Sequence, residues 1–255
     1  IALDLSQSML AEDLPPNRLE RAKLMVLSLL KRLGSDRVAF IVFAGNAYLQ
    51  MPLTVDHSAF KMYLNTIDTR IIPVQGTNFS EAIELAEESF ESGTTKHKAL
   101  IIISDGENHD EEALEQAKLA AENGTHIYTI GVGTEKGAPI PIYSRGGSAV
   151  DYKKDRNGSI VLSKLNPDVL REIAVTGNGE IYMLSEGQSV VGALIDEIEK
   201  IETKEFEEIS YADFDDQFQF FLLVSACLLG LSFFIPNART KKKGSLEFLK
   251  KMRDE

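Results

Sequence analysis

The first residues of the chain have the types and spacing of a metal site. Asp4, Ser6 and Ser8 follow a short apolar run at residues 1–3, which is typical of a buried strand. A tight turn after a strand brings residues two apart onto the same side, so the carboxylate and the two hydroxyls can converge on one point. Oxygen ligands of this kind suit Mg²⁺, which prefers near-octahedral oxygen coordination and keeps several waters.

Two later stretches supply further oxygen atoms. Thr77 lies in a loop that opens a predicted helix, and Asp105 follows the apolar run at residues 100–103. Each acid, serine or threonine alone also fits a plain role as a turn or helix cap. Three separate loops that carry such groups at strand ends, where open α/β sheets bind ligands, favour a metal site instead. The predicted ligands of Mg²⁺, or Mn²⁺ in preference to Ca²⁺, are Asp4, Ser6, Ser8, Thr77 and Asp105.

Composition limits the classes of protein to consider. The chain has 255 residues, is 44% hydrophobic and has a net charge of −12. Residues 236–255 hold seven basic and three acidic side chains, so the rest of the chain is more acidic still and nucleic acid is not an expected partner. Cys227 is the single cysteine, which excludes a disulfide framework and a thiolate metal site. The chain begins inside a strand without Met, so we expect sequence upstream of it.

Signals of an enzyme are weak. There is no G-x-S-x-G or phosphate-binding loop motif, and the four histidines lack H-E-x-x-H spacing. His109 follows the Asp105 loop, but a solvated loop histidine is the simpler reading. A metal-dependent phosphoester hydrolase with Asp4 as nucleophile is the nearest enzymatic alternative, although Ser6 stands where that chemistry normally has a second acid. We therefore predict a protein that is not an enzyme.

Strand and helix patterns alternate along the chain. Helices are expected at about 19–33, 58–67, 79–90, 111–123, 167–174 and 190–201, and strands at about 1–4, 38–43, 98–103, 126–132 and 180–184. A segment at 48–53, broken by Pro52, is expected as an edge strand. This predicts an α/β domain over 1–201, Rossmann-like with three αβα layers and a mainly parallel sheet with one antiparallel edge. Residues 134–164 interrupt the alternation and are expected to form a β-hairpin insertion.

The C-terminal part has a different composition. Residues 218–235 carry no charge and, as a helix, would be about 27 Å long at ~1.5 Å per residue, close to the thickness of a bilayer core. We predict a transmembrane helix there, after an acidic juxtamembrane linker at 202–217 and before a basic tail at 236–255. The positive-inside rule places the tail in the cytoplasm and the domain on the other side of the membrane.

The three loops together resemble a known family. D-x-S-x-S at 4–8, a lone threonine and an acid after a hydrophobic strand are similar to the metal-ion-dependent adhesion site (MIDAS) of von Willebrand factor type A (VWA) domains. The resemblance implies that Ser6 and Ser8 bind the metal directly, Thr77 directly or through water, and the two acids mostly through water. It also implies that the metal binds a carboxylate of a protein partner. A structural VWA module with a vestigial metal site is the other alternative.

Further stretches resemble the bacterial aerotolerance (Bat) membrane proteins. They are residues 8–13, residues 16–20, the Gly137-Ala138-Pro139-Ile140-Pro141 segment and the apolar run after Gln217. This resemblance implies an inner-membrane protein with a periplasmic VWA domain. It also implies an association with other Bat proteins and a MoxR-type AAA ATPase in an envelope complex.

Overall fold

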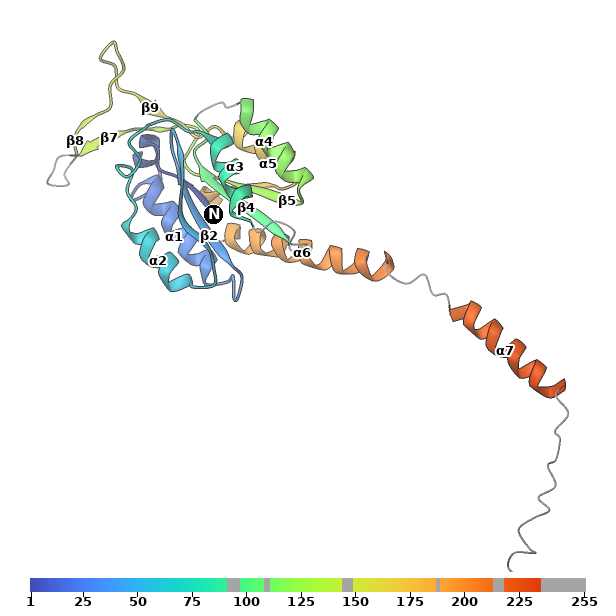
Figure 1. Ribbon diagram of the computed structural model, residues 1–255. Coiled ribbons are helices and arrows are strands. Elements are labelled where there is room, and N and C mark those ends of the chain that lie inside the picture. The colour runs from blue at the N-terminus through green and yellow to red at the C-terminus, as the bar shows by residue number, and fades with distance from the viewer. Residues whose placement is uncertain (91–96, 108–110, 144–148, 187–188, 213–217, 235–255) are drawn as a thin grey trace, which may run out of the picture. The chain divides into compact units, whose positions relative to one another are not determined.

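The computed structural model describes residues 1–90, 97–107, 111–143, 149–186, 189–212 and 218–234 (Figure 1). The chain divides into two compact units, Ile1–Lys204 and Glu205–Glu255. The first unit holds the sheet, the insertion and all the predicted metal ligands.

The sheet of the first unit has six strands in the order β10-β5-β4-β1-β2-β3. All neighbouring strands are parallel except β3, which pairs antiparallel with β2 at the edge. The predicted fold class is confirmed, including the antiparallel edge. The strands are β1 (Ala2–Asp4), β2 (Val38–Phe43), β3 (Ala47–Thr54), β4 (Lys98–Ser104), β5 (Thr125–Gly131) and β10 (Ile181–Met183).

Helices cover both faces of this sheet, which makes three layers (Figure 1). One face packs against α1 (Arg18–Leu30), α2 (His57–Thr66) and the first turns of α6 (Ser189–Ala212); the other packs against α3 (Phe79–Ser89), α4 (Glu111–Glu122) and α5 (Pro167–Thr176). Strand β2 illustrates why both faces of the sheet are covered. Its six residues are all buried, and Phe40 and Phe43 point to opposite faces, where their ring centroids lie 4.7 Å from Phe60 of α2 and 5.6 Å from Phe79 of α3.

The insertion lies between β5 and α5. It forms two small antiparallel sheets, β6 (Ala138–Pro139) with β9 (Leu162–Ser163) and β7 (Pro141–Tyr143) with β8 (Ala149–Tyr152). The Asn157-Gly158 turn joins the pair Lys154 and Ile160, and Gly158 has a φ of +82°, which favours glycine. The insertion is therefore antiparallel as predicted, but it is built from two strand pairs instead of one hairpin.

The C-terminal elements differ from their prediction. Helix α6 continues to Ala212, so residues 202–212 of the predicted linker are helical; residues 213–217 lie outside the described part. Helix α7 (Phe218–Phe234) covers the predicted transmembrane segment except its last residue. Among the described residues, no helix combines the length and the apolarity that a membrane span requires, so the predicted transmembrane helix is not confirmed. The basic tail also lies outside the described residues.

Candidate metal centre

The candidate metal centre lies where β1 and β4 end side by side. These two parallel strands are neighbours in the sheet. Strand β1 pairs with β2 on one side and with β4 on the other, so the chain builds the sheet outward in opposite directions from this point. Such a switch point opens a crevice at the carboxyl ends of the strands. Asp4 is the last residue of β1 and Asp105 directly follows β4, so the sheet order brings the two acids to one crevice.

Asp4, Ser6 and Ser8 form one buried cluster, as their spacing predicts. The Ser6 amide donates to Asp4 Oδ1 at 2.7 Å, which closes the tight turn after β1. The hydroxyl oxygens of Ser6 and Ser8 lie 2.8 Å apart. The second oxygen of Asp4 accepts a hydrogen bond of 2.6 Å from the Ser104 hydroxyl, at the end of β4. The two strand ends are therefore joined through the Asp4 carboxylate.

Asp105 is fully buried and pairs with a cation. Its Oδ2 accepts from Arg18 Nη1 at 2.7 Å, and neither side chain is exposed to solvent. Its Oδ1 accepts a hydrogen bond from the Glu107 amide at 3.3 Å. The loop then turns at Gly106, whose φ is +68°; a Cβ there would lie 2.5 Å from the Asn166 carbonyl oxygen, so only glycine fits.

Arg18 connects this acid to the insertion. Asp13 accepts from Arg18 Nε and Nη2 at 2.8 Å each, and Arg18 also donates to the Ser163 hydroxyl and, at 3.0 Å, to the Ser163 carbonyl. Asp13 in turn accepts from the Thr134 amide at 2.8 Å. A buried guanidinium costs free energy unless its donors are paired, and two carboxylates and a carbonyl meet that need here. Arg18 therefore ties β4, the loop before α1 and both ends of the insertion together.

The two acids of the centre titrate abnormally without a cation. Burial and, second, the negative charge of Asp105 raise the pKa of Asp4 to about 7, although hydrogen bonds from Ser104 and Ser6 act in the opposite direction. Burial also raises the pKa of Asp105, against the opposing positive charge of Arg18. Two buried carboxylates with one guanidinium leave a site that favours added positive charge.

Thr77 is buried at the start of α3, on a loop that is held to the first one. The Gln7 amide donates to Gln75 Oε1 at 3.2 Å, and the Asn78 amide donates to the Ala44 carbonyl at 2.7 Å. The Asn78 side chain caps α3 by accepting the Glu81 amide at 3.0 Å. The cap is therefore Asn78, and the Thr77 hydroxyl is not needed for that purpose. The loop that carries Thr77 is therefore hydrogen-bonded to the loop that carries Ser6 and Ser8.

The donor set fits a hard divalent cation. Its atoms are carboxylate and hydroxyl oxygens, the ligands that Mg²⁺ and Mn²⁺ prefer. Among the described residues no group of three or more His, Cys, Asp and Glu side chains could hold a metal ion, so a metal here would also need the serine and threonine hydroxyls. The metal role of Asp4, Ser6, Ser8, Thr77 and Asp105 stays a prediction.

Sequence reasoning missed two residues of the centre. Ser104 donates to Asp4, and Arg18 pairs with Asp105. The sequence could have indicated Ser104 as part of the centre, because it is the first polar residue after an apolar strand and directly precedes the predicted ligand Asp105. The sequence indication for Arg18 is weaker: it is an arginine beside the apolar stripe of a predicted helix. His109 lies outside the described residues, so its position relative to the centre is not given.

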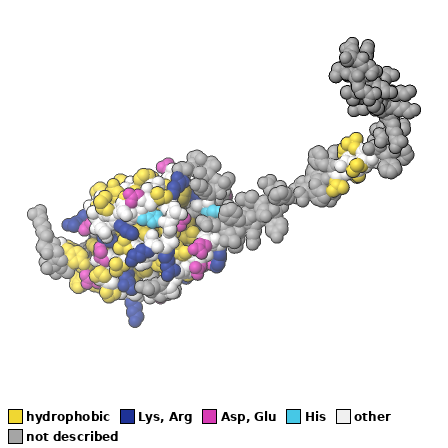
Figure 2. Space-filling view, turned by 90° about the horizontal axis from the view of Figure 1, so that it is seen from below, with side chains coloured by type: hydrophobic (Ala, Val, Ile, Leu, Met, Phe, Trp, Pro, Cys, Tyr) yellow, Lys and Arg dark blue, Asp and Glu magenta, His cyan; other side chains and the backbone are white. Residues whose placement is uncertain are grey.

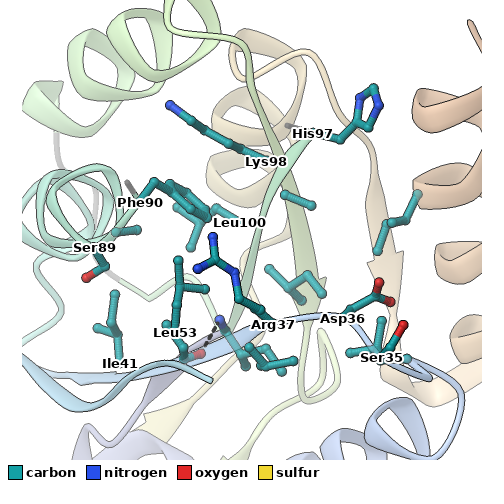
Figure 3. Close-up of a pocket in the computed structure, with 18 residues that line it drawn as sticks. Ser35, Asp36, Arg37, Ile41, Leu53, Ser89, Phe90, His97, Lys98 and Leu100 are labelled. Carbon is teal, nitrogen blue, oxygen red and sulfur yellow. Dashed lines mark hydrogen bonds between the residues drawn. The ribbon is translucent and has the colours of Figure 1, made fainter. Parts of the chain in front are cut away.

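A separate pocket lies at the opposite end of the sheet, where β2 and β4 begin. It has a volume of about 370 Å³ and contains none of the predicted ligands. Figure 3 shows Arg37, His97 and Lys98 on its walls; the Lys98 ammonium lies 5.6 Å from the centroid of the Phe90 ring. Figure 2, a view from below, shows basic and acidic side chains of the first unit interspersed with hydrophobic ones. Charge of one sign does not gather on the described part of this face.

Fold and loops together define a VWA domain. The family model described as von Willebrand factor type A domain matches residues 1–107, which include every predicted ligand. Among solved structures, the conserved hypothetical protein BatB from Bacteroides thetaiotaomicron is 42% identical, with a TM-score of 0.75, and the match covers 79% of this chain and 97% of that one. An aerotolerance-related membrane protein from Bacteroides fragilis is 40% identical, with a TM-score of 0.73 over 78% and 96% of the two chains.

Two curated bacterial proteins extend the comparison. An uncharacterized protein of Borreliella burgdorferi is 27% identical over 92% of this chain, and a UPF0353 protein of Nocardia farcinica is 27% identical over 78%. The chain spans 67% and 61% of the lengths of these relatives. The chain belongs to the von Willebrand factor type A domain proteins of the bacterial aerotolerance family, the group that includes BatB.

Proposed function

We propose that the first unit is a metal-dependent module for protein–protein interaction. A divalent cation, Mg²⁺ or Mn²⁺, binds at the candidate metal centre, and a carboxylate of a partner protein completes its coordination. One observation carries the proposal: Asp4, Ser6 and Ser8 form one buried, hydrogen-bonded oxygen cluster at the switch point of the sheet, and Asp4 is hydrogen-bonded to Ser104, the residue before the buried Asp105. When bound, the cation supplies a positive centre that attracts a carboxylate.

The residues of the centre would contribute to cation binding in different ways. The hydroxyls of Ser6, Ser8 and Thr77 are neutral ligands, and Asp4 and Asp105 supply negative charge from behind them. Arg18 neutralises part of that charge, because it occupies Asp105 Oδ2. A cation held mostly by neutral oxygens keeps enough charge to attract an external acid.

We further propose that the module is anchored to the bacterial inner membrane and acts as a scaffold, not as an enzyme. The similar Bacteroides fragilis protein is described as a membrane protein, and residues 218–235 of this chain are uncharged and followed by a basic segment. The VWA domain would then be periplasmic and the tail cytoplasmic. Other Bat proteins and a MoxR-type AAA ATPase are the proposed members of the complex.

Titration of Mg²⁺ and Mn²⁺ tests the metal role. The full chain and its Asp4→Ala and Thr77→Ala variants are titrated by calorimetry and followed by thermal melting. We expect cation uptake by the wild type, with a rise in melting temperature through mass action. Uptake should be weaker in Thr77→Ala and weakest in Asp4→Ala. A wild-type chain that takes up neither ion at millimolar concentration contradicts the proposal and favours a vestigial site.

Two further measurements separate the alternatives. Turnover of a generic phosphoester by the purified chain, lost in Asp4→Asn, would identify a metal-dependent hydrolase instead of a scaffold. Protease added to spheroplasts should digest the first unit and spare a tag at residue 255. Protection of the first unit with loss of the tag would reverse the proposed orientation.

A further inference from the structure

A groove of about 710 Å³ lies next to the candidate metal centre. One wall is the segment 67–70 with Gln75, the other is the insertion from Ile140 to Tyr143 with Lys153, and the floor is formed by η1 (Gln7–Leu10) and the start of α1. Gln7 lies between the two predicted serine ligands, and its amide donates to Gln75 of the facing wall. The groove therefore lies beside the loop that carries Ser6 and Ser8.

Exposed apolar side chains line one wall of the groove. Ile142 and Tyr143 line it from the insertion and are 48% and 38% exposed. Single exposed hydrophobic residues are ordinary on a protein surface. Two neighbours that line one groove beside a site for a charged ligand indicate a surface that a partner covers.

The charge of the groove is positive on an acidic chain. Both acids of its lining are paired within it, Glu20 with Lys23 at 2.7 Å and Asp68 with Arg70 at 2.9 Å. Lys153 adds a positive charge and forms no ion pair with the residues that the structure describes. The lining thus carries one net positive charge on a chain whose net charge is −12, so the groove is complementary to an acidic ligand.

The walls are held in place before any ligand binds. Lys23 Nζ donates to the Ile67 carbonyl at 2.9 Å, which fixes the segment on one side. On the other side, the Tyr143 hydroxyl donates to Glu12 at 2.9 Å, and Arg18 holds the insertion through Ser163. A groove with fixed walls binds without the entropic cost of ordering them.

We propose that this groove receives an extended segment of the partner protein in which an acidic residue is flanked by apolar side chains. This inference rests on the proposed function, because the acid of that segment is the one that reaches the metal. The apolar neighbours pack against Ile142 and Tyr143, and further acids of the segment lie near Lys153. The groove thus selects the sequence around the acid, which a metal ion alone does not do.

Fluorescence anisotropy with defined peptides tests the proposal on the full chain. The probes are labelled short peptides with one central Asp flanked by Leu, Ile and Phe. One control peptide has Asn in place of Asp, and another has Ser in place of the apolar residues. We expect binding that needs Mg²⁺ and the central acid, and that weakens about tenfold when the apolar residues become Ser.

Matched variants separate the groove from the metal. Ile142→Asp and Lys153→Glu change the groove lining, while Ile160→Asp and Lys154→Glu make the same changes at exposed positions of the insertion outside that lining. We expect the first pair to weaken the apolar Asp peptide about tenfold or more and the second pair to have little effect. Calorimetric uptake of Mg²⁺ should be equal in all four, because none is a predicted ligand.

The outcomes distinguish the groove proposal from the proposed metal function. If Mg²⁺-dependent binding needs only the acid and ignores both flanking residues and groove variants, the groove proposal is wrong while the metal function stands. If wild type takes up Mg²⁺ but binds no peptide at millimolar concentration, the groove proposal is also wrong. Absence of Mg²⁺ uptake overturns the proposed function itself. Equal effects of the groove variants and their controls would show that charge on the insertion, not the groove, governs binding.

Discussion

Arg18 shows how one side chain organises the centre. Its guanidinium is fully buried, and its partners come from the loop before α1, from the end of β4 and from the insertion. Gly133 makes room for it, because a Cβ there would lie 2.7 Å from Arg18 Nε, at a φ of +130°. The buried ion pairs thus specify a geometry, with Asp105 directed toward the other predicted ligands.

Removing Arg18 should strongly destabilise the first unit. Arg18→Leu leaves Asp13 and Asp105 buried without a cation, and breaking such a pair costs about 3–5 kcal/mol. Urea unfolding measures the loss. Arg70→Leu is the matched control, because it removes an arginine whose pair with Asp68 is exposed, and little change is expected. Equal stability of the two variants would contradict the structural role of Arg18.

The titration of Asp4 predicts a pH dependence of the metal-free chain. Burial and Asp105 raise the pKa of Asp4 from 3.8 to about 7. The folded state then holds a proton that the unfolded state releases, so the free energy of unfolding should fall as pH rises from about 4 to about 7. The loss from this group is at most about 4 kcal/mol, at ~1.4 kcal/mol per pKa unit.

Urea unfolding in chelator at a series of pH values measures this loss. Asp4→Asn should flatten the curve, because it removes the titrating group and its repulsion from Asp105. Mg²⁺ should restore wild-type stability at pH 7, since the cation favours the ionised carboxylate. A metal-free wild type whose stability stays constant across this range, or matches that of Asp4→Asn, would show that Asp4 is not strained by burial.

At the scale of elements, the start of α3 positions Thr77. The Asn78 side chain accepts the Glu81 amide at 3.0 Å, and its own amide holds the loop to Ala44. The helix start and the loop with the predicted ligand are therefore one local structure. The same loop passes close to Gly45, where a Cβ would lie 2.8 Å from the Gln75 carbonyl oxygen.

Loss of this cap should affect both stability and metal binding. Asn78→Ala removes an N-cap, at a cost of about 1 kcal/mol, and loosens the residue next to Thr77. Asp56→Ala is the control, because Asp56 caps α2, none of whose residues is a predicted ligand. We expect similar falls in melting temperature, but weaker calorimetric Mg²⁺ uptake only in Asn78→Ala. Unchanged uptake in Asn78→Ala would separate the cap from the centre.

At the scale of the whole molecule, the core ends well before the chain does. Two clusters fill the two faces of the sheet, and among the described residues none of their members lies beyond Ile198. The compact unit correspondingly ends at Lys204. Burial of apolar surface is the main source of stability, and the first unit has a core of its own.

A chain cut after Lys204 should therefore keep its fold and its response to Mg²⁺. The measurement compares circular dichroism, melting temperature and calorimetric titration of residues 1–204 with those of the full chain. We expect melting temperatures within a few degrees of each other and equal uptake of the cation. Aggregation of the cut chain, or a large fall in melting temperature, would show that the second unit stabilises the first.

The sequence alone determined the fold class, the antiparallel edge at β3 and the location of Asp4, Ser6, Ser8 and Asp105. These followed from local signals, because apolar runs, caps and turn residues act within a few positions of each other. The helical residues 202–212 also had a local signal, since they hold good helix formers without Gly or Pro; their charge suggested a linker instead.

Only the tertiary structure decided what surrounds these residues. Arg18 is hydrogen-bonded to Asp105 and Ser163, which lie 87 and 145 residues away along the chain. Ser104 and Asp4, which are also hydrogen-bonded, are 100 residues apart. Such contacts depend on which strands are neighbours and on where the insertion folds back, and no local pattern contains that information. The groove beside the centre has the same origin, because its walls come from segments that lie far apart in the chain and meet only when the sheet has formed.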